Sequence, residues 1–207
     1  GGAQGADGAI AGNGGNGGAG GTGGNGFDQS EIATTRNGSI GVWGGSGAAP
    51  TFGQTFTPTA DSSLYSFEFS TNSEVSGVQP YSAYIYQWNP TNRTVTGPAL
   101  WSASGYTAVA TPAYTPTVIT LGGGSPTLSA GTQYVFFVTT VGNPQTGPSF
   151  RFGSVNPGTY PGGSFFVSFD ANGFTTTWGS AGDLDLAFRA VFAVQVSAVP
   201  GAPGGAA

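Results

Sequence analysis

The sequence predicts an all-β protein: an antiparallel β-sandwich, jelly-roll-like, preceded by an extended Gly-rich arm. First, about ten short apolar or aromatic segments follow residue 26, separated by Gly, Pro, Asn and Asp turn signals. Second, the clearest of them, 184–196, alternates apolar residues with polar or small ones, and no stretch shows the 3.6-residue period of a helix. Third, every aromatic residue lies after residue 26. These observations divide the chain into a Gly-rich part and a β-rich part.

Three segments follow from this division. Residues 1–26 form the Gly-rich arm, 27–198 the β-sandwich domain and 199–207 a Pro/Gly/Ala tail. The middle segment is long enough for one well-buried core. Because the chain begins at a glycine without an initiator Met, we expect a processed or trimmed chain.

From residue 2, glycine recurs at every third position of the arm except at Ala11, and from residue 12 a second column of glycines joins the first. The resulting triplets read GNG, GNG, GAG, GTG and GNG over 12–26. A three-residue period matches an extended left-handed helix, here of the polyglycine II type, whose bare faces let neighbouring backbones exchange hydrogen bonds. A flexible linker and an added strand stay open as alternatives. The glycines predicted to mediate self-association are Gly12, Gly14, Gly15, Gly17, Gly18, Gly20, Gly21, Gly23, Gly24 and Gly26.

The β-rich part contains ten candidate strands. They are 54–57, 63–70, 82–88, 94–102, 117–121, 133–141, 150–152, 164–170, 174–178 and 184–196. Residues 170–173 have the composition of a hairpin turn. In the last strand the alternation places Leu186, Phe188 and Phe192 on the core face and Asp185 and Arg189 on the outward face.

Missing residue types exclude several chemistries. The chain has no His, Cys or Met, and its only cations are four scattered arginines. Histidine relays, thiolate nucleophiles, disulfides and Cys- or His-type zinc sites are therefore excluded. With charged residues at 6% and a net charge of −5, nucleic acid and a polybasic membrane patch are not expected partners. No apolar run reaches the roughly 18 residues of a membrane span.

Acidic residues offer two candidate kinds of site. Glycoside hydrolysis needs two carboxylates about 5 Å or about 6.5–9.5 Å apart. A calcium site needs six to eight oxygen ligands. The carboxylate pairs considered for hydrolysis are Glu68 with Glu74 and Asp183 with Asp185. The oxygen ligands considered for calcium are Asp170 with Asn172, and Asp183 with Asp185. We favour simple solvent-facing or turn roles for all of them, and predict neither catalysis nor a cofactor or metal.

Flat aromatic side chains are candidates for sugar binding. Tyr84, Tyr86 and Trp88 alternate along one strand, which favours a core face over a binding face. The full set considered is Trp43, Trp88, Trp101, Trp178, Tyr81, Tyr84 and Tyr86.

Several segments together resemble the secreted β-sandwich proteins of Gram-negative bacteria that carry a PEP-CTERM sorting tail. The matching segments are GQTFTPTADSSLYSFEFS (53–70), YSAYIYQWNP (81–90), TGPALWSAS (96–104), LSAGTQYVFFVTT (128–140), DLDLAFRAVF (183–192) and VSAVP (196–200). No Pro-Glu-Pro signature follows Pro200, so the resemblance does not extend to the sorting tail. It implies an exported surface or matrix protein. The arm separately resembles the Gly-Gly-X repeats of mycobacterial PE-PGRS proteins and of polyglycine II phage adhesin tips.

We therefore expect a secreted, non-catalytic structural protein that assembles with copies of itself into a filament, sheath or matrix. The expected mechanism is packing of the arm, or strand exchange in which a terminal segment completes a neighbour's sheet. The alternative is a monomeric surface adhesin or carbohydrate-binding module on a flexible Gly-rich tether, with an extracellular glycan as partner.

Overall fold

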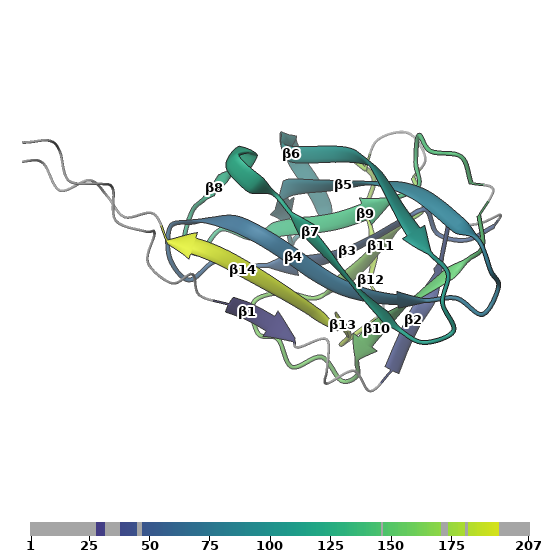
Figure 1. Ribbon diagram of the computed structural model, residues 1–207. Coiled ribbons are helices and arrows are strands. Elements are labelled where there is room, and N and C mark those ends of the chain that lie inside the picture. The colour runs from purple at the N-terminus through teal and green to yellow at the C-terminus, as the bar shows by residue number, and fades with distance from the viewer. Residues whose placement is uncertain are drawn as a thin grey trace, which may run out of the picture.

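The computed structural model describes residues 28–31, 38–44, 47–145, 147–170, 174–180 and 182–194. The predicted Gly-rich arm, its self-association glycines and the tail lie outside these residues. The described residues form two antiparallel sheets that face each other across a common core (Figure 1). The predicted antiparallel β-sandwich is thereby confirmed.

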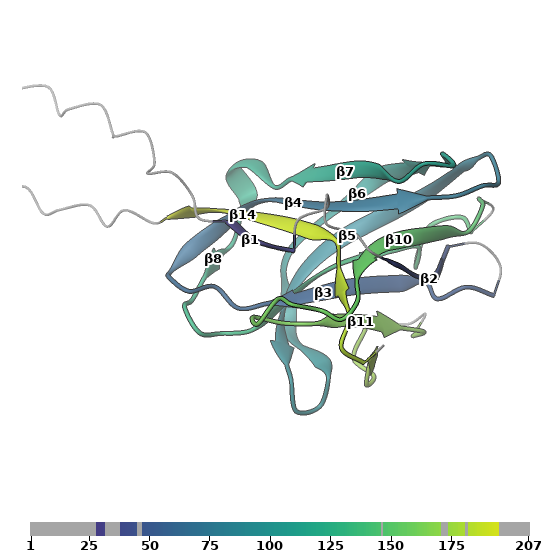
Figure 2. The same cartoon turned by 90° about the horizontal axis from the view of Figure 1, so that it is seen from below.

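Sheet A has eight strands, with β4 at its centre. On one side β4 pairs with β14 and, at its end, with β10, while β7 and β8 pair with its other side. β1 lies beside β14 in both views, and β2 pairs with β10 (Figures 1 and 2). The bounds are β1 (Asp28–Glu31), β2 (Gly38–Trp43), β4 (Ser62–Asn72), β7 (Thr115–Thr120), β8 (Thr127–Leu128), β10 (Phe150–Val155), β13 (Asp185–Leu186) and β14 (Phe188–Val194).

Sheet B has six strands in the order β12-β11-β3-β9-β5-β6. Its longest pairing is the hairpin of β5 and β6, whose register shifts twice along its length. The bounds are β3 (Thr51–Phe56), β5 (Val78–Asn89), β6 (Thr94–Val109), β9 (Tyr134–Thr139), β11 (Phe165–Ser168) and β12 (Gly179–Ser180). A short 3₁₀ turn, η2 (Gly122–Gly124), lies between β7 and β8.

Aromatic rings from both sheets fill the space between them. Phe67 of β4 stacks on Phe136 of β9 with ring centroids 4.1 Å apart, and Phe188 of β14 lies 5.4 Å from Phe67. Toward β2, the Trp43 indole is buried and its Nε1 donates a hydrogen bond of 2.9 Å to the carbonyl of Pro50. The buried face predicted for the last strand is confirmed at Leu186, Phe188, Ala190 and Phe192.

A bulge in β2 interrupts the strict alternation that a flat strand would have. Ile40 and Trp43 are both buried although they are three residues apart. Between them, Gly41 and Val42 together lie opposite Arg151 of β10, so β2 carries one extra residue. Gly41 has φ +61°, and a Cβ at this position would overlap the ring of Phe52. The bulge needs glycine there, and it turns Val42 outward while Trp43 returns to the core.

The outer face of sheet B carries a second hydrophobic cluster. Tyr81, Ala83 and Ile85 of β5 face the core between the sheets, so the alternating residues Tyr84, Tyr86 and Trp88 face the other way. The prediction that these three share one face is confirmed, but the prediction that it is the face of the main core is wrong. The segment 174–178 provides Phe174 and Trp178, which pack with them on the outside of the sheet.

Candidate functional site

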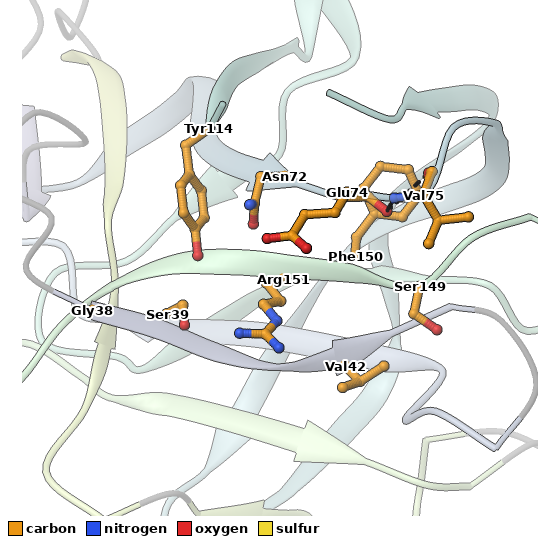
Figure 3. A pocket seen from close by; sticks show the side chains of 11 residues that line it. Gly38, Ser39, Val42, Asn72, Glu74, Val75, Tyr114, Ser149, Phe150 and Arg151 are labelled. Atoms are coloured by element: carbon orange, nitrogen blue, oxygen red, sulfur yellow. Dashed lines mark hydrogen bonds between the residues drawn. The ribbon is translucent and has the colours of Figure 1, made fainter. Parts of the chain in front are cut away.

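A polar cleft of about 650 Å³ lies on the outer face of sheet A. Its walls come from β2, from the end of β4 and the loop after it, from the residue before β7, and from the start of β10 (Figure 3). We call it the polar cleft. Its lining residues are Gly38, Ser39, Val42, Asn72, Ser73, Glu74, Val75, Tyr114, Ser149, Phe150 and Arg151.

Three polar side chains cross the floor of the polar cleft as a row. Asn72 of β4 is directly opposite Arg151 of β10 in the antiparallel register. On the other side of β4, Thr71 pairs with Thr115, so Tyr114 comes next to Asn72. Residues opposite each other on neighbouring strands have their side chains on the same face. The sheet therefore holds a phenol ring, a carboxamide and a guanidinium side by side.

Hydrogen bonds fix the wall of the cleft on the Tyr114 side. The amide of Ser73 donates to the carbonyl of Thr111 at 2.9 Å. The hydroxyl of Thr111 donates to the carbonyl of Ala113 at 2.8 Å and lies 2.7 Å from the hydroxyl of Thr115. These bonds tie the loop after β4 to the turn that carries Tyr114, so the cleft is built before any ligand arrives.

A separate hydrogen bond orients the side chain of Asn72. Its Nδ2 donates a hydrogen bond of 3.2 Å to the carbonyl of Pro112. Its Oδ1 is shielded from solvent and has no hydrogen-bond partner among the described residues. An unsatisfied buried carbonyl oxygen of this kind is energetically costly.

The two charged groups of the cleft have opposite signs. Glu74 and Arg151 are both exposed, and within the described residues neither forms an ion pair or a hydrogen bond. In Figure 3 their side chains approach the middle of the cleft from the loop after β4 and from β10. Its described residues therefore offer one carboxylate acceptor and one forked guanidinium donor, whose charges balance.

Two valines lie at the opposite end of the polar cleft, near Ser149 (Figure 3), and one of them, Val42, also lines an apolar groove between β2 and β11. Val42 of β2 and Val75 of the loop after β4 lie there, away from Tyr114 (Figure 3). Their side chains are 48% and 67% exposed. We call the end that carries both valines the apolar end of the cleft, and the end at Tyr114 its polar end.

The structure does not bring together the candidate pair Glu68 and Glu74. Glu68 lies within β4 opposite Arg189 of β14 and Val118 of β7. Glu74 lies beyond the end of β4 and is the only carboxylate among the residues that line the polar cleft. The described lining of the cleft thus provides one carboxylate, whereas glycoside hydrolysis uses two.

The predicted outward position of Asp185 is wrong. Asp185 is 2% exposed, and its two oxygens accept hydrogen bonds from Gln54 Nε2 at 2.8 Å and from the amide of Tyr160 at 3.1 Å. The reason is that the short strand β13 leaves the line of β14 to pair with β10, which turns Asp185 toward β3. Asp183 is exposed, so the two carboxylates do not form the candidate pair.

The buried carboxylate affects a neighbouring phenol. The pKa of Tyr160 is raised to about 12, mainly by burial of its phenol. The hydrogen bond from the amide of Thr57 acts to lower this pKa, and the negative charge of Asp185 acts to raise it. Asp185 therefore has a structural role, joining β13 to sheet B through Gln54.

The candidate calcium pair of Asp170 and Asn172 lies only partly within the described residues. No group of three or more acidic side chains is gathered there. Asp170 accepts a hydrogen bond of 3.3 Å from the hydroxyl of Thr176, and Asn172 lies outside the described residues.

Most of the aromatic residues considered as candidates for sugar binding are buried. Trp43, Trp88, Trp178 and Tyr81 are in the two hydrophobic clusters, and Trp101, Tyr84 and Tyr86 are partly covered by them. Tyr114, which lines the polar cleft, was not among the candidate residues. Its only sequence signal is an aromatic residue in a turn between two Thr-Pro pairs at 111–116.

A second, apolar groove of about 470 Å³ lies between β2 and β11. Phe169 at its rim is 71% exposed. In the described ranges, no helix has the length and apolar character needed to cross a lipid bilayer.

Searches of protein-family models and of curated protein sequences find no match for this chain. Among solved structures it is similar to the crystal structure of the cysteine protease and lectin-like domains of Cwp84, a surface layer associated protein of Clostridium difficile. The TM-score is 0.44 at 15% identity, over 70% of this chain and 32% of that chain. A second structure of the clostridial cysteine protease Cwp84, after propeptide cleavage, gives 0.45 at 10% identity, over 77% of this chain and 38% of that one. The chain thus spans about a third of the length of these proteins.

Proposed function

We propose that this chain is a non-catalytic extracellular carbohydrate-binding module and that the polar cleft is its binding site. The observation that carries the proposal is the row of Tyr114, Asn72 and Arg151 with Glu74 beside it in one cleft. Sugars offer vicinal hydroxyls and a flat ring face. Amide, carboxylate and guanidinium groups can form two hydrogen bonds with a pair of neighbouring hydroxyls. An aromatic ring packs on the flat face of the sugar.

Binding without catalysis is supported by the composition of the cleft. Glu74 is the single carboxylate in its lining, whereas glycoside hydrolysis uses two. A charge-neutral cleft in a chain with few cations also fits an uncharged polar ligand better than a nucleic acid. An extracellular location is supported by the low charge content and by the surface-protein resemblance of the sequence.

The test is a glycan-array screen followed by calorimetric titration of the best ligand. Arg151→Ala removes the guanidinium, and Glu74→Gln replaces a charged carboxylate with a neutral amide, so we expect affinity to fall at least about tenfold in each variant. The matched control is Glu68→Gln, which makes the same chemical change on the same face of sheet A outside the cleft. If Glu74→Gln and Glu68→Gln bind equally well, the cleft is not the site.

A second proposal concerns self-association into a filament, sheath or matrix through the Gly-rich arm. It is supported by a charged content of 6%, which gives copies little mutual repulsion, and by the exposed ring of Phe169. Sedimentation velocity of the full chain and of a chain lacking residues 1–26 tests it. If both sediment alike as monomers, or if both polymerise, the arm is not the assembling element.

A further inference from the structure

We propose that the glycan bound in the polar cleft carries an N-acetyl group, and that Val42 and Val75 hold the methyl of that group. This inference rests on the proposed glycan binding and names the ligand class of the same site. Its starting point is the apolar end of the cleft, where two valines from separate elements are exposed beside polar groups.

Both valines are placed in the cleft by specific backbone features. Val42 faces outward because the bulge at Gly41 adds a residue to β2 before Trp43 returns to the core. Val75 is held by Ser73, whose hydroxyl accepts from the amide of Val75 at 3.3 Å and donates to its carbonyl at 3.1 Å. An ordered turn therefore presents Val75 to the cleft.

The polar end suits the rest of an N-acetyl group. An amide N–H needs an acceptor, which the carboxylate of Glu74 supplies. An amide C=O needs a donor, which the guanidinium of Arg151 supplies. A sugar with only hydroxyls satisfies these groups but leaves both valines in contact with water.

The charge of the cleft agrees with this ligand. An N-acetylated amino sugar is uncharged and carries a donor, an acceptor and a methyl group within a few bonds of one another. Glu74 and Arg151 balance each other, so the cleft does not favour a charged sugar over a neutral one. One buried methyl group gives a preference of about fourfold, before any gain from the amide hydrogen bonds.

The experiment compares two tetrasaccharides that share a β-1,4-linked backbone and differ in the group on C2. Chitotetraose has an acetamido group there, and cellotetraose has a hydroxyl. Calorimetric titration of the full chain is expected to show chitotetraose binding at least about fourfold more tightly. Val42→Thr and Val75→Thr keep the side-chain shape, and each should lower chitotetraose affinity by about two- to fourfold while leaving cellotetraose unchanged. The control is Val118→Thr, an exposed valine of β7 on the same face outside the cleft.

The possible outcomes separate this inference from the proposed function. Equal affinity for the two oligosaccharides, or threonine variants that leave their ratio unchanged, overturns the N-acetyl inference while glycan binding stands. If neither oligosaccharide binds and the array finds a glycan without an N-acetyl group whose affinity depends on Glu74, the N-acetyl inference alone is again overturned. If no glycan binds, the proposed function and this inference fail together.

Discussion

The two outer faces of the sandwich differ in what covers them. On sheet B, an apolar outer face is covered by the chain's own segment 174–178, and Trp178 lies there with no exposed surface. On sheet A, the outer face carries Glu68, Asn72, Arg151 and Arg189, and no described segment covers the polar cleft at its end.

The difference shows how one β-sandwich can have both a thicker core and an open site. An apolar outer face is unfavourable in water, so the chain folds back over it and gains a second cluster. Gly53 makes this possible, because a Cβ there would lie 3.0 Å from Phe137 and 3.1 Å from Trp178. A polar outer face needs no cover, and its side chains remain available to a ligand.

Removing the cover of sheet B gives the largest expected effect. The Trp178 ring lies 5.4 Å from that of Trp88 and 5.2 Å from that of Phe137. Trp178→Ala therefore leaves a cavity over Gly53, and we expect it to lower the free energy of unfolding by about 3–5 kcal/mol, measured by urea denaturation. Below the unfolding transition, glycan affinity should be unchanged, because the cleft is on the other sheet.

Arg151→Ala is the counterpart of that variant. Its side chain is exposed, so the free energy of unfolding should change by no more than about 0.5 kcal/mol while glycan affinity falls at least about tenfold. A Trp178→Ala protein that is fully stable, or that loses glycan binding while folded, would contradict the division of roles between the two faces.

The bulge under the polar cleft gives an intermediate effect. Gly41→Ala places a β-carbon against the ring of Phe52 at φ +61°, so we expect a loss of about 1–3 kcal/mol and weaker glycan binding as Val42 shifts. Gly105→Ala is the matched control: φ is +83°, but the added carbon meets nothing within 4 Å. It should show the backbone strain alone, about 1 kcal/mol, with binding unchanged. Equal losses in the two variants would mean that the contact with Phe52 adds nothing.

The fold class could be predicted because alternation is a local property. The buried positions from Leu186 to Phe192 follow from their spacing alone. The cleft could not be predicted, since Asn72 and Arg151 come together only because two strands far apart in the sequence pair. Neither strand's own sequence identifies its partner. Val42 and Asp185 show a second reason: a bulge and a change of pairing partner each reverse the face that simple alternation assigns.

The smallest effect concerns the pKa of Tyr86 on the covered face. Burial in the sheet B cluster raises this pKa above 10, and the neighbouring Tyr84 raises it further. The folded state then holds the phenol proton more strongly than the unfolded state does. Its contribution to stability is therefore complete below about pH 10 and is lost as the pH rises through the folded-state pKa.

Phe174 lies against both tyrosines, with ring centroids 5.4 Å from Tyr84 and 6.5 Å from Tyr86. Phe174→Ala lets water reach the phenols, so the pKa of Tyr86 should fall toward 10 in a ¹³C-tyrosine NMR titration. Phe166→Ala is the control, because Phe166 contacts Trp88 at 4.8 Å in the same cluster but makes no ring contact with Tyr86. If both variants lower the pKa equally, general loosening is responsible. If neither variant lowers the pKa of Tyr86, water already reaches the outer face of sheet B, and the contrast between the two faces disappears.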